Sequence, residues 1–149
     1  MPGSYPRLEQ FALWCRWAFG LFLILTGSGI AFWMGSHFAR HHTWRGLLGV
    51  GLLIAASVLF GLSYVWKPRL AFPATYAFFA FALWLFSNTV NKYLGNKAWA
   101  EANGFVQTIF GSGLLVLLAG FLLYRLHSVA ARGDDALLGY LGWPHLKSK

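Results

Sequence analysis

Residues 73–93 read PATYAFFAFALWLFSNTVNKY, and no charged side chain precedes Lys92 in this stretch. A proline in the first position of a helix loses no hydrogen bond, so Pro73 predicts a helix start. Wound at about 100° per residue, the segment separates into an aromatic and aliphatic face and a face of small residues. The second face ends in Asn88 and Asn91. The stretch therefore predicts a transmembrane helix whose polar end points into a helix bundle.

The composition of the whole chain is unlike that of a water-soluble domain. Of its 149 residues, 58% are hydrophobic and 11% are charged. Soluble domains of this size carry about a quarter charged residues. The charges of this chain stand in the gaps between long apolar runs, and 19% of the residues are aromatic. This segregation indicates a protein that crosses a lipid bilayer several times.

Four apolar runs are long enough for such a crossing, which takes about 20 helical residues. We predict transmembrane helices at about residues 11–34, 46–66, 73–93 and 105–125. The short link between the second and third of these requires neighbouring antiparallel helices. The predicted fold is an all-α integral membrane protein, an antiparallel bundle of four transmembrane helices with short loops. Residues 1–149 form a single transmembrane domain in this prediction.

Two segments outside the spans also contain apolar residues. Residues 98–102 predict a brief interfacial helix in the loop between the third and fourth spans. Residues 126–149 form a tail, and its apolar piece at 137–143 is too short to cross a bilayer. We expect this piece to lie along the membrane surface or to dock on another subunit.

The distribution of Lys and Arg predicts the orientation. Of the 12 such residues, the first and third loops hold Arg40, Arg45, Lys92 and Lys97. The head, the second loop and the tail hold the larger group, Arg7, Arg16, Lys67, Arg69, Arg125, Arg132, Lys147 and Lys149. Because cytoplasmic loops carry the excess of basic residues, both termini are placed in the cytoplasm. A bacterial inner membrane is the expected location.

Small residues recur on one face of several spans, where membrane helices approach each other closely. The predicted packing positions are Gly20, Gly27, Ala31 and Gly35 in the first span, Gly49, Ala56 and Ser63 in the second, and Gly104, Gly111 and Ala119 in the fourth. The fourth span also carries Gly113 and Gly120 on its opposite side. Two small-residue faces favour contact with a neighbour on each side, within the bundle or from another protein.

Hydrogen-bonding side chains gather at one end of the third and fourth spans. They are Asn88 and Asn91, late in the third span, and Gln107 and Thr108, early in the fourth, with Phe81 and Trp84 as apolar walls. Antiparallel helices bring these ends to the same side of the membrane. We therefore predict a polar-headed pocket for a quinone, a pigment or a lipid. The alternative is that the amides bond to each other or to water.

Arg16 and the histidines of the first loop are further candidates. Arg16 shares a face with Gly20, so a buried Arg16 binds a substrate or headgroup, whereas a snorkelling one anchors at the interface. His37 and His41 have the spacing of metal ligands on one helical face, but no Cys, Asp or Glu in that loop completes a site. We therefore expect no metal.

The small number of acidic residues and their positions in the sequence predict that the protein is not an enzyme. The chain has four of them, Glu9, Glu101, Asp134 and Asp135, and none lies in a predicted span. General acid–base catalysis needs titratable groups held together, and ion-coupled transport places one at membrane depth. The net charge of +8 does not indicate nucleic-acid binding, because the basic residues stand at span ends and form no stripe.

We expect a non-catalytic accessory or structural subunit of a larger respiratory, photosynthetic or transport complex. Its partners are then the lipid bilayer and other membrane subunits. One alternative is a small oligomeric carrier or channel, although the spans contain no internal proline or inverted repeat of the kind that transporters use. Another is a membrane module that binds a quinone, a pigment or a lipid.

Overall fold

The computed structural model describes residues 6–40 and 44–142, and within these ranges the chain forms helices and no strand. The α-helices are α1 (Pro6–Arg40), α2 (Trp44–Val65), α3 (Ala71–Gly95), α4 (Lys97–Asn103), α5 (Gly111–Ala130) and α6 (Asp134–Tyr140). A 3-10 turn, η1 (Pro68–Leu70), precedes α3, and a π-helical segment, η2 (Val106–Phe110), precedes α5. The predicted all-helical class is confirmed for the described residues.

Four helical stretches are long and apolar enough to cross a membrane. They are Gln10–His37, Trp44–Val65, Pro68–Gly95 and Val106–Ala130. The predicted number of candidate spans is therefore confirmed by length and composition. The first helix, Pro6–Arg40, extends beyond the predicted 11–34 at both ends, because no proline follows Pro6 to stop it and the helical glycine near its end, Gly35, costs only about 1 kcal/mol.

Pro73 does not start the third long helix. The 3-10 turn η1 has Pro68 at its first position, and α3 begins directly after it at Ala71. Pro73 stands in the first turn of α3, where a backbone N–H has no partner within the helix. The proline is tolerated there without opening the helix.

The segment that follows α5 folds back onto the start of α3. Because α5 continues to Ala130, it includes the first residues that were predicted as tail. Gly133 then turns the chain into α6 with a φ of 118°. A buried apolar cluster joins the three helices through Ala71, Leu126, Leu137 and Leu141. Leu137 and Leu141 thus pack against their own chain, while Leu138 and Tyr140 of the same piece are not buried. The expected position of this piece along a membrane surface or on another subunit stays a prediction.

Residues 97–103 confirm a short helix in the third loop. The Asn96 side chain accepts a hydrogen bond from the Trp99 backbone N–H at 3.0 Å and so caps the start of α4. Gly104 ends α4 with a φ of 69°, a conformation that favours glycine.

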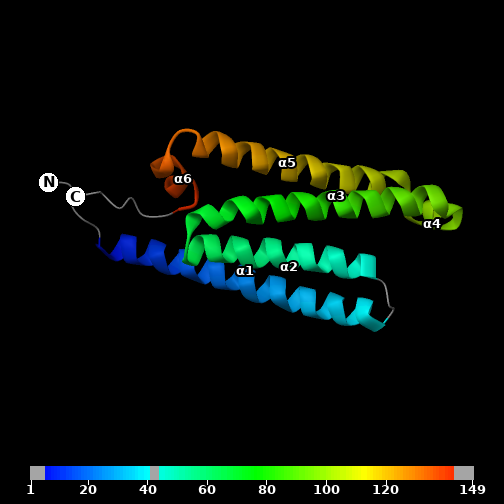
Figure 1. Cartoon of the computed structure of the whole chain (residues 1–149), viewed down its shortest axis with the longest axis horizontal. Helices are drawn as coiled ribbons and strands as arrows, with labels where there is room; N and C mark the ends of the chain where they lie inside the picture. The colour runs from blue at the N-terminus through cyan, green and yellow to red at the C-terminus, as the bar shows by residue number, and fades with distance from the viewer. Residues whose placement is uncertain (1–5, 41–43, 143–149) are drawn as a thin grey trace.

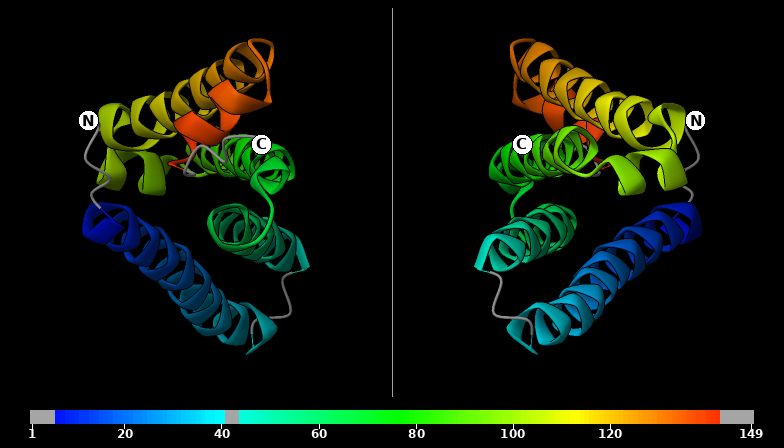
Figure 2. Two further views of the ribbon diagram at one scale, coloured as in Figure 1. Left: turned by 90° about the vertical axis from the view of Figure 1, so that its left-hand side faces the viewer. Right: turned by 90° about the vertical axis from the view of Figure 1, so that its right-hand side faces the viewer.

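The long helices stand in a row in chain order. Extended contacts link α1 with α2, α2 with α3 and α3 with α5, and Figure 2 shows α1 and α5 at the two ends of the row. In Figure 1 the path runs along successive helices in alternating directions, so that the start of α1 and α6 lie on one side. In a closed four-helix bundle each helix has two long neighbours. Here the two outer helices have one each among the described residues.

The contact between α1 and α2 is made by backbone against backbone. A methyl group added at Gly20 would stand 2.9 Å from the carbonyl oxygen of Gly61. One added at Gly61 would stand 2.6 Å from the carbonyl oxygen of Gly20. A methyl group added at Gly27 would collide with the Ser57 side chain of α2. The same side of α1 continues with Ala31, which is 1% exposed, and Gly35, which faces Val50.

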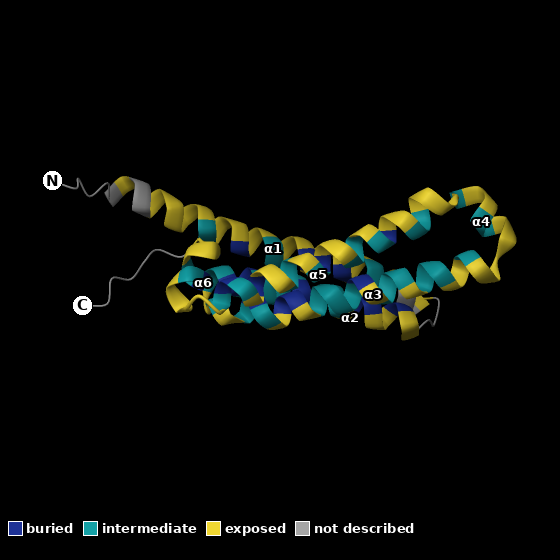
Figure 3. Cartoon of the chain, turned by 90° about the horizontal axis from the view of Figure 1, so that it is seen from above, coloured by how far each residue is buried: buried dark blue, intermediate teal, exposed yellow. Residues whose placement is uncertain are grey.

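The interior of the row consists mainly of small side chains. The buried residues include Ala56, Ser63, Ala74, Ala82 and Ala119. The large apolar side chains, such as Phe32, Leu25 and Leu117, are exposed instead. Figure 3 shows the buried residues between the helices and the exposed ones over the first half of α1 and over α4. Small residues inside and large apolar residues outside are typical of helices that pack within lipid.

The fourth span meets α3 with Gly113 and Gly120, the second of its two predicted small-residue faces. An added methyl group at Gly113 would lie 3.7 Å from Phe86, and one at Gly120 would lie 3.5 Å from Phe79. At Gly111, by contrast, such a group meets nothing within 4 Å. Ala119 is fully buried, but Gly111 precedes it by eight residues and is therefore turned about 80° around the helix.

Within this chain, Gly104 and Gly111 make no close contact with another helix, so their predicted packing role stays a prediction for a partner outside the chain. The two residues flank the π-helical segment η2, so the α-helical spacing that assigned them one face does not apply. Gly104 serves as the turn that ends α4, and Gly111 is exposed at the start of α5.

Candidate functional site

Three of the predicted ligand residues line one cavity between α2 and α3. The cavity has a volume of about 380 Å³ and includes Phe81, Trp84 and Asn88. The rings of Phe81 and Trp84 stack with centroids 5.9 Å apart and planes at 23°. Asn88 lies one turn further along α3, toward the end of the helix. The cavity therefore has an aromatic wall and an amide closer to the helix terminus.

The backbone of α2 fixes the position of Trp84. A methyl group added at Gly49 would collide with the six-membered ring of the Trp84 indole. Only glycine at position 49 leaves room for that ring, so Gly49 sets both the approach of α2 to α3 and the shape of the aromatic wall.

Gln107 and Thr108 line a second cavity, on the side of α3 that faces α5. Its volume is about 390 Å³, and Thr89 and Trp99 belong to its lining as well as to that of the first cavity. The predicted residues therefore gather at the same end of the helices, but α3 divides them between two cavities. The π-helical segment η2 carries Gln107 and Thr108.

Asn91 and Arg16 lie outside both cavities. Asn91 is exposed, because it follows Asn88 by three residues and is turned about 60° away around α3. Arg16 is half-buried on α1, one turn before Gly20. Since Gly20 packs beside Gly61 near the end of α2, Arg16 lies far from the first cavity, which adjoins the start of α2.

The polar side chains near the cavities bond to their own helices. Asn88 donates from Nδ2 to the carbonyl oxygen of Trp84 at 2.9 Å, and Thr89 donates to that of Leu85 at 2.8 Å. Thr108 donates to the carbonyl oxygen of Gly104 at 2.6 Å. This back-bonding is common for Ser and Thr inside apolar helices. The bond from Asn88 Nδ2 is thus to its own helix and not to another amide, whereas bonding of the amides to water stays a prediction.

Two basic residues that the sequence reasoning did not assign to a site also line the first cavity. Arg45 comes from the first turn of α2 and Lys92 from the last turn of α3. The Lys92 ammonium group lies 6.0 Å from the centroid of the Trp99 ring. The sequence predicts both residues only as anchors at the membrane interface. Their spacing along the chain does not show which side of a helix end faces a neighbouring helix.

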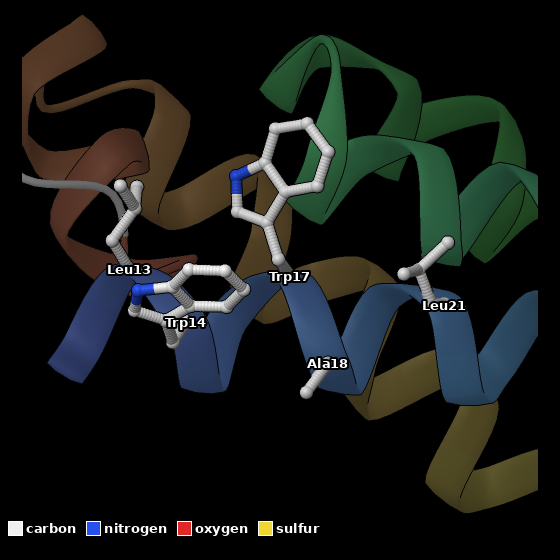
Figure 4. Close-up of a pocket in the computed structure, with 5 residues that line it drawn as sticks. All are labelled: Leu13, Trp14, Trp17, Ala18 and Leu21. Carbon is white, nitrogen blue, oxygen red and sulfur yellow. The ribbon is translucent and has the colours of Figure 1, made fainter. Parts of the chain in front are cut away.

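A separate, apolar groove runs along the first half of α1. Figure 4 shows its lining, Leu13, Trp14, Trp17, Ala18 and Leu21, all from this one helix. Its volume is about 490 Å³, and Trp14 is 74% exposed. The lining atoms are almost all apolar. The groove suits a hydrocarbon chain, but it lacks the few convergent polar groups that orient a specific ligand.

A polar cluster lies at the other end of the long helices. The Tyr76 hydroxyl and His127 Nε2 are 2.8 Å apart, and the Phe72 ring meets the His127 ring edge-on at 5.2 Å. Asp134, at the start of α6, accepts a hydrogen bond from Arg69 at 3.4 Å. Among the residues that the structure describes, no three His, Cys, Asp or Glu side chains gather as metal ligands. His41 lies outside the described residues.

Comparison of the chain with protein-family models, with curated proteins and with solved structures gives no match.

Proposed function

We propose that the chain is an integral membrane protein whose four long helices cross the bilayer as an antiparallel bundle opened into a row. Four helices of sufficient length and apolarity support this placement, as do the large apolar side chains on their outer surfaces. The excess of Lys and Arg on one side supports cytoplasmic termini in a bacterial inner membrane. Residues 1–149 then constitute a single transmembrane domain.

Thiol labelling tests this orientation. In a Cys15→Ser background, Lys97→Cys and Ala131→Cys place single thiols at exposed positions at opposite ends of the long helices. We expect a membrane-impermeant maleimide to label position 97 in spheroplasts and position 131 only after permeabilisation. The reverse pattern contradicts the orientation, and labelling of both positions in intact spheroplasts contradicts membrane insertion.

Within that placement, we propose that the protein is a non-catalytic accessory subunit of a larger membrane complex. The exposed surface of α5 carries this proposal. Gly113 and Gly120 face α3, whereas Gly111 is exposed at the edge of α5, where it also lines the cavity with α3 and an added methyl group meets nothing within 4 Å. Interfaces between transmembrane helices are enriched in small residues that let the backbones approach closely. This edge of α5 therefore suits a helix of another subunit.

The position of α5 in the row supports the same conclusion. In the most apolar 18-residue window of the span Val106–Ala130, which includes α5, 11% of the residues are buried inside this chain, against 33% for the span of the inner helix α2. The exposed apolar side chains of this span include Phe110, Leu114, Leu118 and Phe121. An outer helix with one long neighbour keeps a full side available for a partner.

Purification in a mild detergent tests the proposal. We expect the tagged full-length chain to bring down fixed partner chains in constant ratio, and we expect Gly111→Leu to release them by filling the gap. Gly51→Leu is the matched control, because Gly51 is also exposed with nothing within 4 Å but lies on the central helix. A homo-oligomer without other chains overturns the accessory role in favour of the carrier or channel. Equal loss of partners in both variants overturns the assignment to α5.

A further inference from the structure

The cavity between α2 and α3 has the layout of an amphiphile site. Its inner part is apolar and is lined by Val50, Leu53, Phe81 and Trp84. Arg45, Lys92 and Trp99 stand at the part that adjoins the helix ends. A volume of about 380 Å³ falls in the range of small-molecule pockets, at about 300–1,000 Å³. One end of a ligand would thus meet hydrocarbon and aromatic rings, and the other would meet charges.

The charges at this rim have one sign. Arg45 and Lys92 line the cavity without any Asp or Glu. Glu101 of α4 lines a different cavity, and the ion pair between Arg69 and Asp134 lies at the other end of the helices. The positive end of the α2 helix dipole adjoins the same rim. The rim is therefore complementary to an anion.

Specific contacts between side chains and backbone hold the apolar wall of the cavity in place. Glycine at position 49 is what allows the Trp84 ring to lie against the backbone of α2, and Phe81 stacks on that ring. Asn88 bonds to the backbone of its own helix through Nδ2, which fixes the side chain beside the wall. The two cations come from opposite helices, α2 and α3, that pack together around this wall.

We propose that this cavity binds an anionic phospholipid of the surrounding bilayer, with the headgroup phosphate between Arg45 and Lys92 and an acyl chain along Phe81 and Trp84. The site goes beyond the accessory role and rests only on the membrane placement. Charge-assisted hydrogen bonds from Arg and Lys to phosphate are among the strong ones in proteins. Trp99 stands at headgroup level, where indole rings are favoured.

Lipid titration of the full-length protein, followed by native mass spectrometry, tests the site. Phosphatidylglycerol is the probe, and phosphatidylcholine, which carries no net charge, is the control lipid. We expect Arg45→Gln/Lys92→Gln to weaken the first phosphatidylglycerol adduct about tenfold or more while leaving phosphatidylcholine adducts unchanged. Arg45→Lys/Lys92→Arg, which keeps both charges, restores most of the binding.

The matched control is Arg40→Gln/Lys97→Gln. It removes the same charge at the same end of the helices, from exposed residues that do not line this cavity. We expect it to change phosphatidylglycerol binding by less than about twofold. Equal weakening in both double variants overturns the site in favour of diffuse surface attraction, as does unchanged binding in Arg45→Gln/Lys92→Gln.

Two further measurements are needed. The first distinguishes binding of a lipid from binding of a free anion, and the second distinguishes loss of the site from misfolding of the variant. Displacement of phosphatidylglycerol by millimolar inorganic phosphate would overturn the lipid assignment, because an acyl chain in the apolar wall should make the lipid the stronger ligand. Single variants Arg45→Gln and Lys92→Gln keep the test decisive if the double variant does not fold, and each is expected to show a partial loss. Membrane extraction of the same variants shows separately whether the membrane placement itself holds.

Discussion

The two outer contacts of the helix row are built differently. Between α1 and α2, the carbonyl oxygens of Gly20 and Gly61 each stand within 3 Å of where a methyl group on the other glycine would be. Between α3 and α5, a methyl group added at Gly120 or Gly113 would lie 3.5 Å from the Phe79 ring or 3.7 Å from the Phe86 ring, which are ordinary contact distances. The first contact tolerates no added atom, whereas the second retains space. Small residues in membrane helices therefore differ in importance. The atoms that lie opposite each glycine determine whether a larger residue fits there.

The largest effect is expected for Gly61→Ala. The new methyl group would lie 2.6 Å from the carbonyl oxygen of Gly20 and would also strike Ile24, and a backbone atom cannot rotate away. Overpacking of this kind costs about 1–3 kcal/mol, so we expect a fall in melting temperature of about 2–12 °C. Intrinsic tryptophan fluorescence of the protein in mild detergent measures it. A melting temperature equal to that of the unmodified chain would show that α1 and α2 do not cross here.

The sequence predicted the positions of this contact on α1 but not its partners. A spacing of small residues identifies the face of a helix, and Gly20, Gly27 and Ala31 all lie on the buried side. It does not give the depth at which a second helix crosses. Gly61 was therefore not assigned a role, although the backbone of Gly20 rests directly against it.

The candidate site shows a similar limit. Phe81, Trp84 and Asn88 were predicted as lining residues, and the structure places them in one cavity. Gln107 and Thr108 were placed at the correct end of the helices, but the π-helical segment that carries them has no signal in the pattern of apolar residues. A π-helical turn changes which side of the helix each later residue faces.

A smaller effect is expected for Gly49→Ala. The added methyl group meets the Trp84 ring, which is a side chain and is able to turn, so the strain is relieved in part. We expect a loss of about 1–2 kcal/mol and a change in tryptophan fluorescence, since Trp84 leaves its contact with α2. Gly49→Ala in a Trp84→Phe background is the control. An equally large loss there would show that the indole is not what limits position 49.

Gly120→Ala is expected to act in the opposite direction. The methyl group has 3.5 Å to Phe79, an ordinary van der Waals contact. Alanine in a helix is favoured over glycine by about 0.8–1.0 kcal/mol, so the melting temperature should rise by a few degrees. The same fluorescence melt compares this variant with Gly61→Ala. A fall in both variants would remove the distinction between the two outer contacts.

The smallest effect is expected for the ion pair that links the start of α6 to the 3-10 turn before α3. Arg69 and Asp134 stand 3.4 Å apart, and their side chains are 78% and 76% exposed. Exposed pairs of this kind contribute about 0–1 kcal/mol and are screened by salt. Asp134→Asn keeps the size of the side chain and removes its charge, and Asp135→Asn is the control in the same turn of α6. We expect both to shift the melting temperature by less than about 2 °C, since Leu137 and Leu141 hold α6 by burial rather than by charge. A larger loss for Asp134→Asn alone, abolished in high salt, would mean that the ion pair and not the apolar cluster fixes α6 to the start of α3.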